Sequence, residues 1–134
     1  MTNFVIIDSS FDRNIILDLY AKFPDFEKDI HKNVDEEFHY NPYSVFGSFG
    51  GWLVNLILEG EKLGTIEQSF DFINDLCEQN AGDCNGILQV TFFEHLTDYK
   101  ITIEAAQAKL RTIALKLFEE VLNGPIFQGG KSAN

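Results

Sequence analysis

The chain has 134 residues, 45% of them hydrophobic, and its 21 acidic and 10 basic residues give a net charge of −11. A chain of this length and apolar content can bury one sizeable core, which argues against disorder. The charge excess lies in residues 1–86, with sixteen acids and five bases, whereas residues 87–134 have five of each. Such a surface repels phosphate backbones, so the composition argues against a nucleic-acid partner and favours a basic protein partner.

The N-terminal sequence MTNFVIIDSSFDRN has no basic region, and Asp8 interrupts its short apolar run, so it is unlike a secretory signal. We therefore expect a cytoplasmic protein. In that compartment the two cysteines, Cys77 and Cys84, are expected to be reduced and partly buried rather than joined in a disulfide. The segment NFVIID is expected to add a short strand or to pack against the rest of the fold.

Two helices are expected in the N-terminal third of the chain. Ser9 and Ser10 can cap a helix that continues to about Lys22, because apolar residues recur at helical spacing before Pro24 ends it. Asp25 is expected to cap the second helix. Its apolar face is formed by Phe26, Ile30, Val34 and Phe38.

The stretch NPYSVFGSFGGWLVNLILEGEK, from Asn41 to Lys62, predicts a third helix that starts at Asn41 and Pro42. One side is bulky and apolar: Val45, Phe46, Phe49, Trp52, Leu53, Leu56 and Ile57. The other side is mostly small: Ser44, Gly47, Ser48, Gly50, Gly51, Val54 and Asn55. Its proline, glycines and flanking acids argue against a membrane span, so we expect the central buried helix of a soluble fold. Gly47 and Gly51 are expected to allow a neighbouring helix to approach closely.

Three further helices are expected in the second half of the chain. Thr65 is expected to cap the fourth, which continues to about Gln79 with Ile66, Phe70, Ile73 and Cys77 inward. The stretch ILQVTFFEHLTDY favours a fifth helix with Ile87, Leu88, Phe92 and Leu96 inward, and a strand is the alternative. A long sixth helix is expected to begin near Thr102 and to end at Gly124 and Pro125. Its inward residues are Ala106, Leu110, Ile113, Leu117 and Val121.

This pattern predicts an all-α fold of about six antiparallel helices, arranged as a helical bundle or as a short HEAT-like α-solenoid. The helix pairs over residues 44–79 and 86–123 are similar in length and could be a diverged repeat of about 40 residues. We expect a single helical domain over residues 1–124, followed by a mobile tail over residues 125–134.

The sequence shows no strong signature of catalysis or of metal binding. Glu36 and His39 have the spacing used in di-iron bundles, but only one such pair is present. Glu27, His31 and Asp35 could share a helix face, where an exposed ion-paired surface is the simpler interpretation. A nucleophile elbow, a phosphate loop and a thiol-hydrolase motif are all missing, so no catalytic residue, metal ligand or cofactor is predicted.

Four acids fall on one side of the predicted fourth helix: Glu67, Asp71, Asp75 and Glu78. We call this set the acidic stripe. Repulsion along it should destabilise the helix by roughly 1 kcal/mol, because the helix contains no lysine to relieve it. The stripe is therefore a candidate surface for a basic partner, to which Asp35, Glu36 and Glu37 could add. The alternative is that these acids only keep a small domain soluble.

Three stretches carry a resemblance to known proteins: NPYSVFGSFGGWLVNLI, SFDFINDL and VTFFEHLTD. They resemble small acidic helical bacterial proteins classed as domains of unknown function, some of which are similar to immunity proteins encoded beside polymorphic or contact-dependent toxins. The similarity extends from about Asn41 to Asp98 and brings no catalytic or ligand-binding residue with it. It implies a helical protein that binds a toxin.

Charge and resemblance together favour a non-catalytic immunity protein that neutralises a cognate toxin through its acidic surface. Many toxins of this kind are nucleases with basic clefts, which an acidic helical domain could occlude. Two alternatives stay open: a helical adaptor or regulatory scaffold with a non-toxin partner, and an enzyme whose site residues are dispersed along the chain. None of these three hypotheses requires a cofactor or a membrane.

Overall fold

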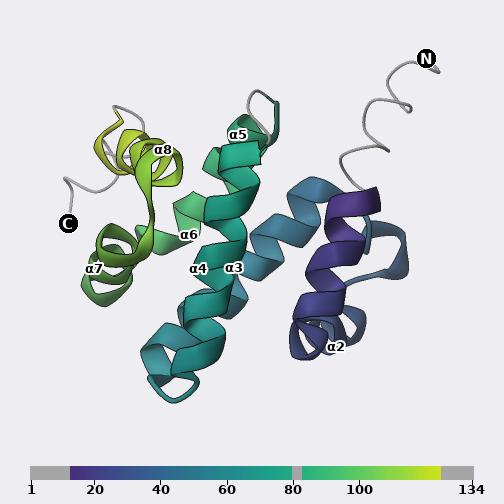
Figure 1. The fold of residues 1–134 in the computed structure, drawn as a ribbon. Coiled ribbons are helices and arrows are strands. Elements are labelled where there is room, and N and C mark those ends of the chain that lie inside the picture. Colours follow the sequence, from purple (N-terminus) through teal and green to yellow (C-terminus); the bar gives the residue numbers. More distant parts are fainter. Residues whose placement is uncertain (1–12, 80–82, 125–134) are drawn as a thin grey trace.

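Helices account for nearly all of the residues that the computed structural model describes, which are 13–79 and 83–124, and these ranges contain no strand (Figure 1). The predicted all-α class is confirmed, and the helices pack as a bundle. Three predictions fall on residues outside these ranges: the NFVIID strand, the Ser9 and Ser10 cap, and the tail over residues 125–134.

The first two helices contact each other through the rings of Tyr20 and Phe26, whose centroids are 6.0 Å apart. One helix covers residues 13–22 and buries Leu19, and Phe23 then precedes α2, Pro24–Asn33, with the proline at the first helical position. The buried residues of α2 are Phe26 and Ile30, as predicted.

The second helix is shorter than predicted. Residue Val34 is extended, with φ −127° and ψ 140°, and a short 3-10 helix η1, Glu36–Phe38, follows. The ring Nε2 of His39 lies 2.7 Å from the carbonyl oxygen of Val34, an acceptor that a continuing helix would have used. The chain therefore turns back, and Phe38 is 40% exposed instead of joining the apolar face.

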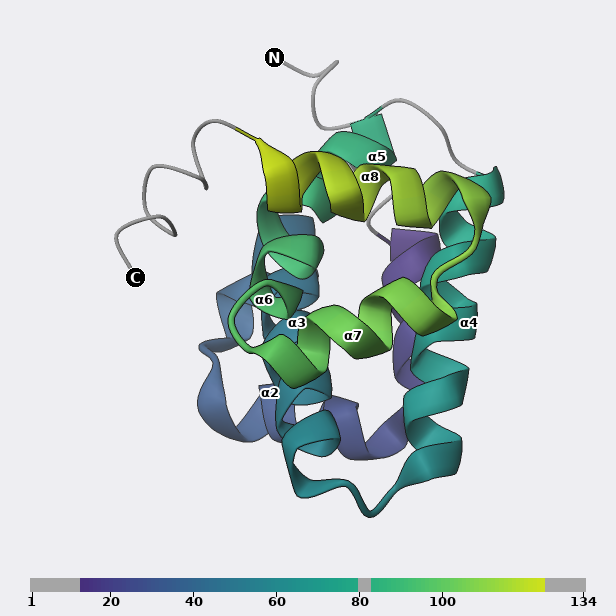
Figure 2. The same cartoon turned by 90° about the vertical axis from the view of Figure 1, so that its left-hand side faces the viewer.

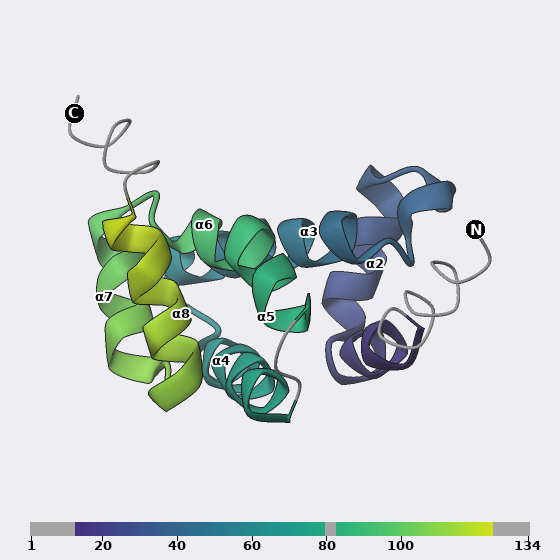
Figure 3. The ribbon, with the colours of Figure 1, turned by 90° about the horizontal axis from the view of Figure 1, so that it is seen from above.

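The third helix, α3, Pro42–Glu59, is the central helix of the fold, as predicted. Asn41 caps it, because its side-chain oxygen accepts the backbone N–H of Ser44 at 3.0 Å. Gly60 ends it with φ +70°, a conformation that glycine adopts without a steric penalty. Figure 3 shows α3 running through the middle of the molecule, with α2 at one end and α7 and α8 at the other.

The close helix contact on α3 is at Gly50 and not at Gly47 or Gly51, which corrects the expectation from the sequence. A Cβ on Gly50 would lie 2.9 Å from Cδ2 of His95 and 3.1 Å from the carbonyl oxygen of Phe92. No neighbour lies within 4 Å of a Cβ at Gly47, and at Gly51 the nearest atom is 4.0 Å away. The glycine that packing requires is therefore the one that faces the helix carrying Phe92.

The fourth helix, α4, is Leu63–Gln79 and begins two residues earlier than the expected Thr65 cap. The predicted inward residues are buried: Ile66, Phe70, Ile73 and Cys77.

The fifth helix is one continuous segment with a π-helical turn. It consists of α5, Asp83–Leu88, the π-helix η2, Gln89–Phe93, and α6, Glu94–Leu96. A π turn inserts one residue into the helical register, so the adjacent residues Phe92 and Phe93 are both fully buried. The helix prediction is confirmed here, although the sequence did not reveal the π turn.

The predicted sixth helix is two helices, α7, Lys100–Lys109, and α8, Thr112–Asn123 (Figure 2). Leu110 and Arg111 between them are extended, with ψ angles of 141° and 156°. Buried Asn74 of α4 stabilises this break: its amide donates to the carbonyl of Lys109 at 3.1 Å, and its oxygen accepts the N–H of Arg111 at 2.7 Å. The break shifts the inward face of α8 to Ala114, Phe118 and Val121 and leaves Ile113 39% exposed.

The centre of the core is aromatic. The ring of Phe49 lies 5.1 Å from that of Phe26, 5.3 Å from Phe23 and 5.6 Å from Phe92, measured between centroids. Trp52 stacks on Phe49 at 5.7 Å with an interplanar angle of 21°. Contacts of this kind add about 0.5–1.5 kcal/mol each beyond burial, so α3 is anchored to its neighbours through these rings.

Candidate functional site

The acidic stripe lies on α4, and we call it the α4 stripe from here on. All four of its acids are exposed, and each is paired with a cation from the α7–α8 junction. Lys109 contacts Glu67, and Arg111 contacts the other three carboxylates. The distances from Arg111 are 3.5 Å to Asp71, 3.1 Å to Asp75 and 3.6 Å to Glu78.

These pairs correct one part of the sequence interpretation. The expected repulsion within α4 is relieved by two cations that lie about 40 residues further along the chain, so the stripe also contributes to the fold. Four carboxylates against two cations still leave the surface negative. Its role in partner binding stays a prediction.

The second set of predicted contact residues has no such internal cations. Asp35, Glu36 and Glu37 are exposed, and none of them forms an ion pair within residues 13–79 and 83–124. Two exposed aromatic side chains follow in the chain: Phe38 at the end of η1 is 40% exposed, and Tyr43 in the first turn of α3 is 56% exposed. Figure 3 shows this segment well apart from α4, so the two acidic sets do not form one continuous patch.

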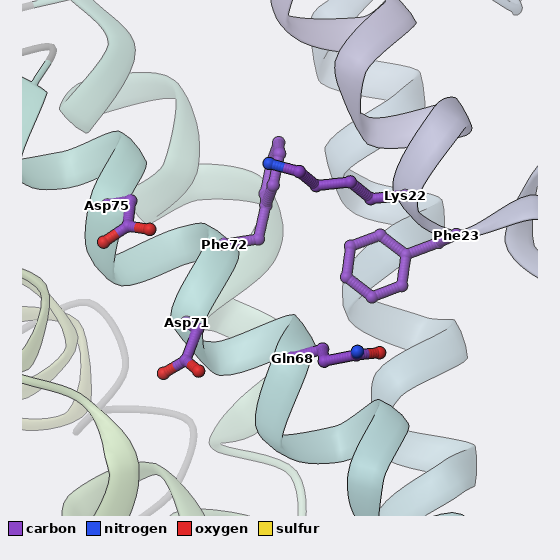
Figure 4. A pocket seen from close by; sticks show the side chains of 6 residues that line it. All are labelled: Lys22, Phe23, Gln68, Asp71, Phe72 and Asp75. Atoms are coloured by element: carbon purple, nitrogen blue, oxygen red, sulfur yellow. The ribbon is translucent and has the colours of Figure 1, made fainter.

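A cleft between the helix over residues 13–22 and α4 lies beside the stripe. It comprises two adjoining cavities of about 270 and about 130 Å³, which share Lys22, Phe72 and Asp75 (Figure 4). The ammonium of Lys22 lies 5.6 Å above the ring of Phe72 and 3.5 Å from the carboxylate of Asp18. We call this the Lys22 cleft, and its own lysine already occupies the position that an incoming cation would take.

A groove of about 390 Å³ lies between α2, α3 and the turn after α6, and we call it the Trp52 groove. Its lining is Asp29, Asn33, Val34, Ser48, Gly51, Trp52, Val54, Asn55, His95, Asp98 and Tyr99. The small residues of α3 form part of it. Sequence reasoning missed this groove because it placed Trp52 only in the core, although the small side of α3 was a signal that space remained there.

The three histidines do not converge on one metal centre. His31 and His39 stack at 4.5 Å between ring centroids, and His31 lies 4.0 Å from Glu27, whereas His95 packs on Gly50. Tyr20 donates its hydroxyl to the carbonyl of His39, and burial raises the pKa of that tyrosine above its usual value of 10.0. Among the described residues, no group of three or more histidine, cysteine, aspartate or glutamate side chains could hold a metal ion.

The two cysteines are free thiols in the core. Burial raises the pKa of Cys77 from its ordinary value of 9.0 to about 12, with a smaller contribution from the charge of Glu78. Burial also raises the pKa of Cys84 to about 12. Thiols of this kind are poor nucleophiles near neutral pH.

Within the described ranges, each helix is too short or too polar to cross a bilayer. The geometry therefore defines an all-helical bundle with a markedly acidic surface, an internally paired charged face and an open groove beside its central helix.

A family model described as Domain of unknown function (DUF7674) matches residues 16–123, and the chain belongs to this family. The match confirms the expected relation to domains of unknown function. It extends on both sides of the stretch from Asn41 to Asp98 that carried the resemblance in sequence. Comparisons with curated proteins and with solved structures gave no match.

Proposed function

We propose that this protein is a non-catalytic protein-binding domain, and specifically an immunity protein that neutralises a cognate bacterial toxin by covering a basic surface of that toxin. The observation that carries the proposal is the exposed segment with Asp35, Glu36 and Glu37, which have no ion pair within the described residues. Exposed Phe38 and Tyr43 follow these acids in the chain. A few aromatic anchors supply much of the binding energy at protein interfaces, and charges around them steer the partner.

The overall charge supports the same proposal. A net charge of −11 attracts a basic partner over long range and speeds the encounter. The α4 stripe, with four carboxylates against two cations, adds to this field but is already held within the fold. We therefore assign the main contact to Asp35, Glu36 and Glu37 and a secondary one to the stripe.

The first test is genetic and biochemical. An immunity gene should lie directly downstream of a toxin gene, and co-expression of this chain should relieve growth inhibition by that toxin. The chain should also co-purify with the toxin domain in a stoichiometric complex. Capture of a partner that inhibits no growth would favour an adaptor instead, and turnover of a small molecule by the purified chain would overturn the non-catalytic assignment.

The second test addresses the contact surface with a matched control. A triple variant replaces Asp35, Glu36 and Glu37 by lysine, and the control replaces Glu59, Glu61 and Glu119 by lysine, so both change the net charge equally. We expect the first variant to bind the toxin domain at least about tenfold more weakly at low salt, and the control to change affinity much less. Equal effects of the two variants would mean that only net charge matters.

A further inference from the structure

We propose that the Trp52 groove binds an arginine side chain presented by an exposed segment of the protein partner. The inference rests on the proposed function, because it specifies one contact through which a basic partner is held. It goes further by assigning a pocket and a chemical group.

Charge complementarity favours a cation in this groove. Two carboxylates, Asp29 and Asp98, belong to its lining, and none of the described lining residues is a lysine or an arginine. The Lys22 cleft differs, since Lys22 lies within it and contacts Asp18. His95 is therefore the one basic side chain in the described lining, and Asp29 presents a negative charge to the groove.

The carboxylate of Asp29 is held in place before any partner arrives. Asn33, one turn later on α2, donates its side-chain amide to Oδ1 of Asp29 at 3.1 Å and to the Asp29 carbonyl at 3.0 Å. This exposed hydrogen bond restrains one carboxylate oxygen and leaves the other for a ligand. Fixing a group beforehand reduces the entropy that is lost on binding.

The aromatic wall of the groove favours arginine over lysine. Trp52 is half-buried and its indole is held by Phe49 at 5.7 Å and by Phe26 at 5.6 Å, so the ring is rigid. Tyr99 contributes a second aromatic side chain to the lining and is 49% exposed. A planar guanidinium can stack on such rings while it forms two hydrogen bonds to a carboxylate, whereas an ammonium is a strongly hydrated point charge.

Space is available for the side chain. A Cβ at Gly51 would meet only Cε1 of His95, at 4.0 Å, and Ser48 beside it is small. With a volume of about 390 Å³, the groove is large enough to admit a side chain together with part of its backbone.

The test uses the fluorescence of Trp52, which is the only tryptophan in the chain and therefore reports on the groove directly. The probe is an acetylated, amidated triarginine peptide, and its controls are the tricitrulline peptide, which has the same shape without charge, and the trilysine peptide. We expect a saturable change in emission with triarginine, weaker binding of trilysine, and at least about fivefold weaker binding of tricitrulline.

Matched variants then locate the binding site. Asp29→Asn combined with Asp98→Asn should weaken triarginine binding roughly fivefold or more, while Asp71→Asn combined with Asp75→Asn removes the same charge from the α4 stripe and should change it about twofold or less. The single variant Asp29→Asn and circular dichroism serve as controls for folding, because Asp98 has further contacts.

Three results would overturn the arginine assignment. Equal binding of triarginine and tricitrulline would indicate a neutral segment as the occupant, and equal effects of the two double variants would indicate a nonspecific charge effect. A change in emission with protein concentration alone would indicate a second copy of this chain. If the toxin co-purifies but the peptides fail to bind, the groove inference is wrong and the proposed function stands. If the peptides bind but no toxin partner is found, the groove binds arginine and the proposed function is wrong.

Discussion

The side-chain oxygen of Asn74 accepts the backbone N–H of Arg111 at 2.7 Å, across 37 residues of sequence. The amide of the same asparagine donates to the carbonyl of Lys109 at 3.1 Å. One buried side chain thereby satisfies two of the backbone groups that the break between α7 and α8 leaves without helical partners. This contact also positions Lys109 and Arg111 beside the α4 stripe.

Replacing Asn74 should therefore destabilise the fold. Asn74→Ala removes the partners of a part-buried N–H and a part-buried C=O, and we expect a loss of roughly 2–4 kcal/mol in the free energy of unfolding, measured by urea denaturation. Asn85→Ala is the matched control, since the Oδ1 of Asn85 is buried without a hydrogen-bond partner in the described structure. Equal losses in the two variants would show that the Asn74 bonds do not stabilise the break.

The ion pairs of Arg111 predict a modest, salt-dependent effect. Arg111→Ala should lower the free energy of unfolding slightly at low salt, because the guanidinium contacts three exposed carboxylates. The loss should shrink at high salt, where exposed charges are screened. Lys116→Ala on α8, at an exposed lysine without an ion pair in the described structure, is the control. Thermal unfolding of both variants at two salt concentrations measures these losses. A loss in Arg111→Ala that does not depend on salt would indicate a packing effect instead.

The two central glycines should respond oppositely to alanine. Gly50→Ala places a methyl group 2.9 Å from Cδ2 of His95 and 3.1 Å from a backbone oxygen, so we expect a loss of about 1–3 kcal/mol. Gly47→Ala meets no atom within 4 Å and should stabilise the helix by up to about 1 kcal/mol. Urea denaturation of both variants tests whether His95 and Phe92 lie against Gly50 as they do in the structure. A Gly50→Ala protein without loss of stability would contradict this packing.

Stability should fall as the pH rises above about 9. The pKa of each buried thiol is about 12 in the fold, compared with 9.0 for an ordinary cysteine, so between these values the unfolded chain has lost protons that the folded chain retains. The contribution of the two buried thiols to the free energy of unfolding is therefore fully present below pH 9 and declines as the pH rises toward 12. Urea denaturation from pH 7.5 to 10.5 in reductant should show this decline, flattened in a Cys77→Ala, Cys84→Ala variant. An identical slope in that variant would assign the decline to other groups.

The same burial predicts slow thiol chemistry. In the folded protein at pH 8, both cysteines should react far more slowly with an aromatic disulfide reagent than they do in urea, since almost no thiolate is present and access is blocked. The number of thiols titrated over time measures this protection. Rapid reaction of the native protein would show that the region around Cys77 and Cys84 opens readily.

The sequence alone determined those features that depend on neighbouring residues. The cap at Asn41, the proline at the start of α3 and its bulky stripe were all readable, because capping and helical periodicity act within a few residues. The all-α class and the inward face of α4 follow from the same local rules.

Only the tertiary structure decided the features that join distant residues. The break at Leu110 exists because Asn74, 35 residues before Lys109, supplies the missing hydrogen bonds, and helical periodicity alone continues across it. The pairing of the α4 stripe with Lys109 and Arg111 and the lining of the Trp52 groove have the same origin. Such contacts depend on how the helices pack in space, and a local pattern of residue types does not encode which distant side chain arrives there.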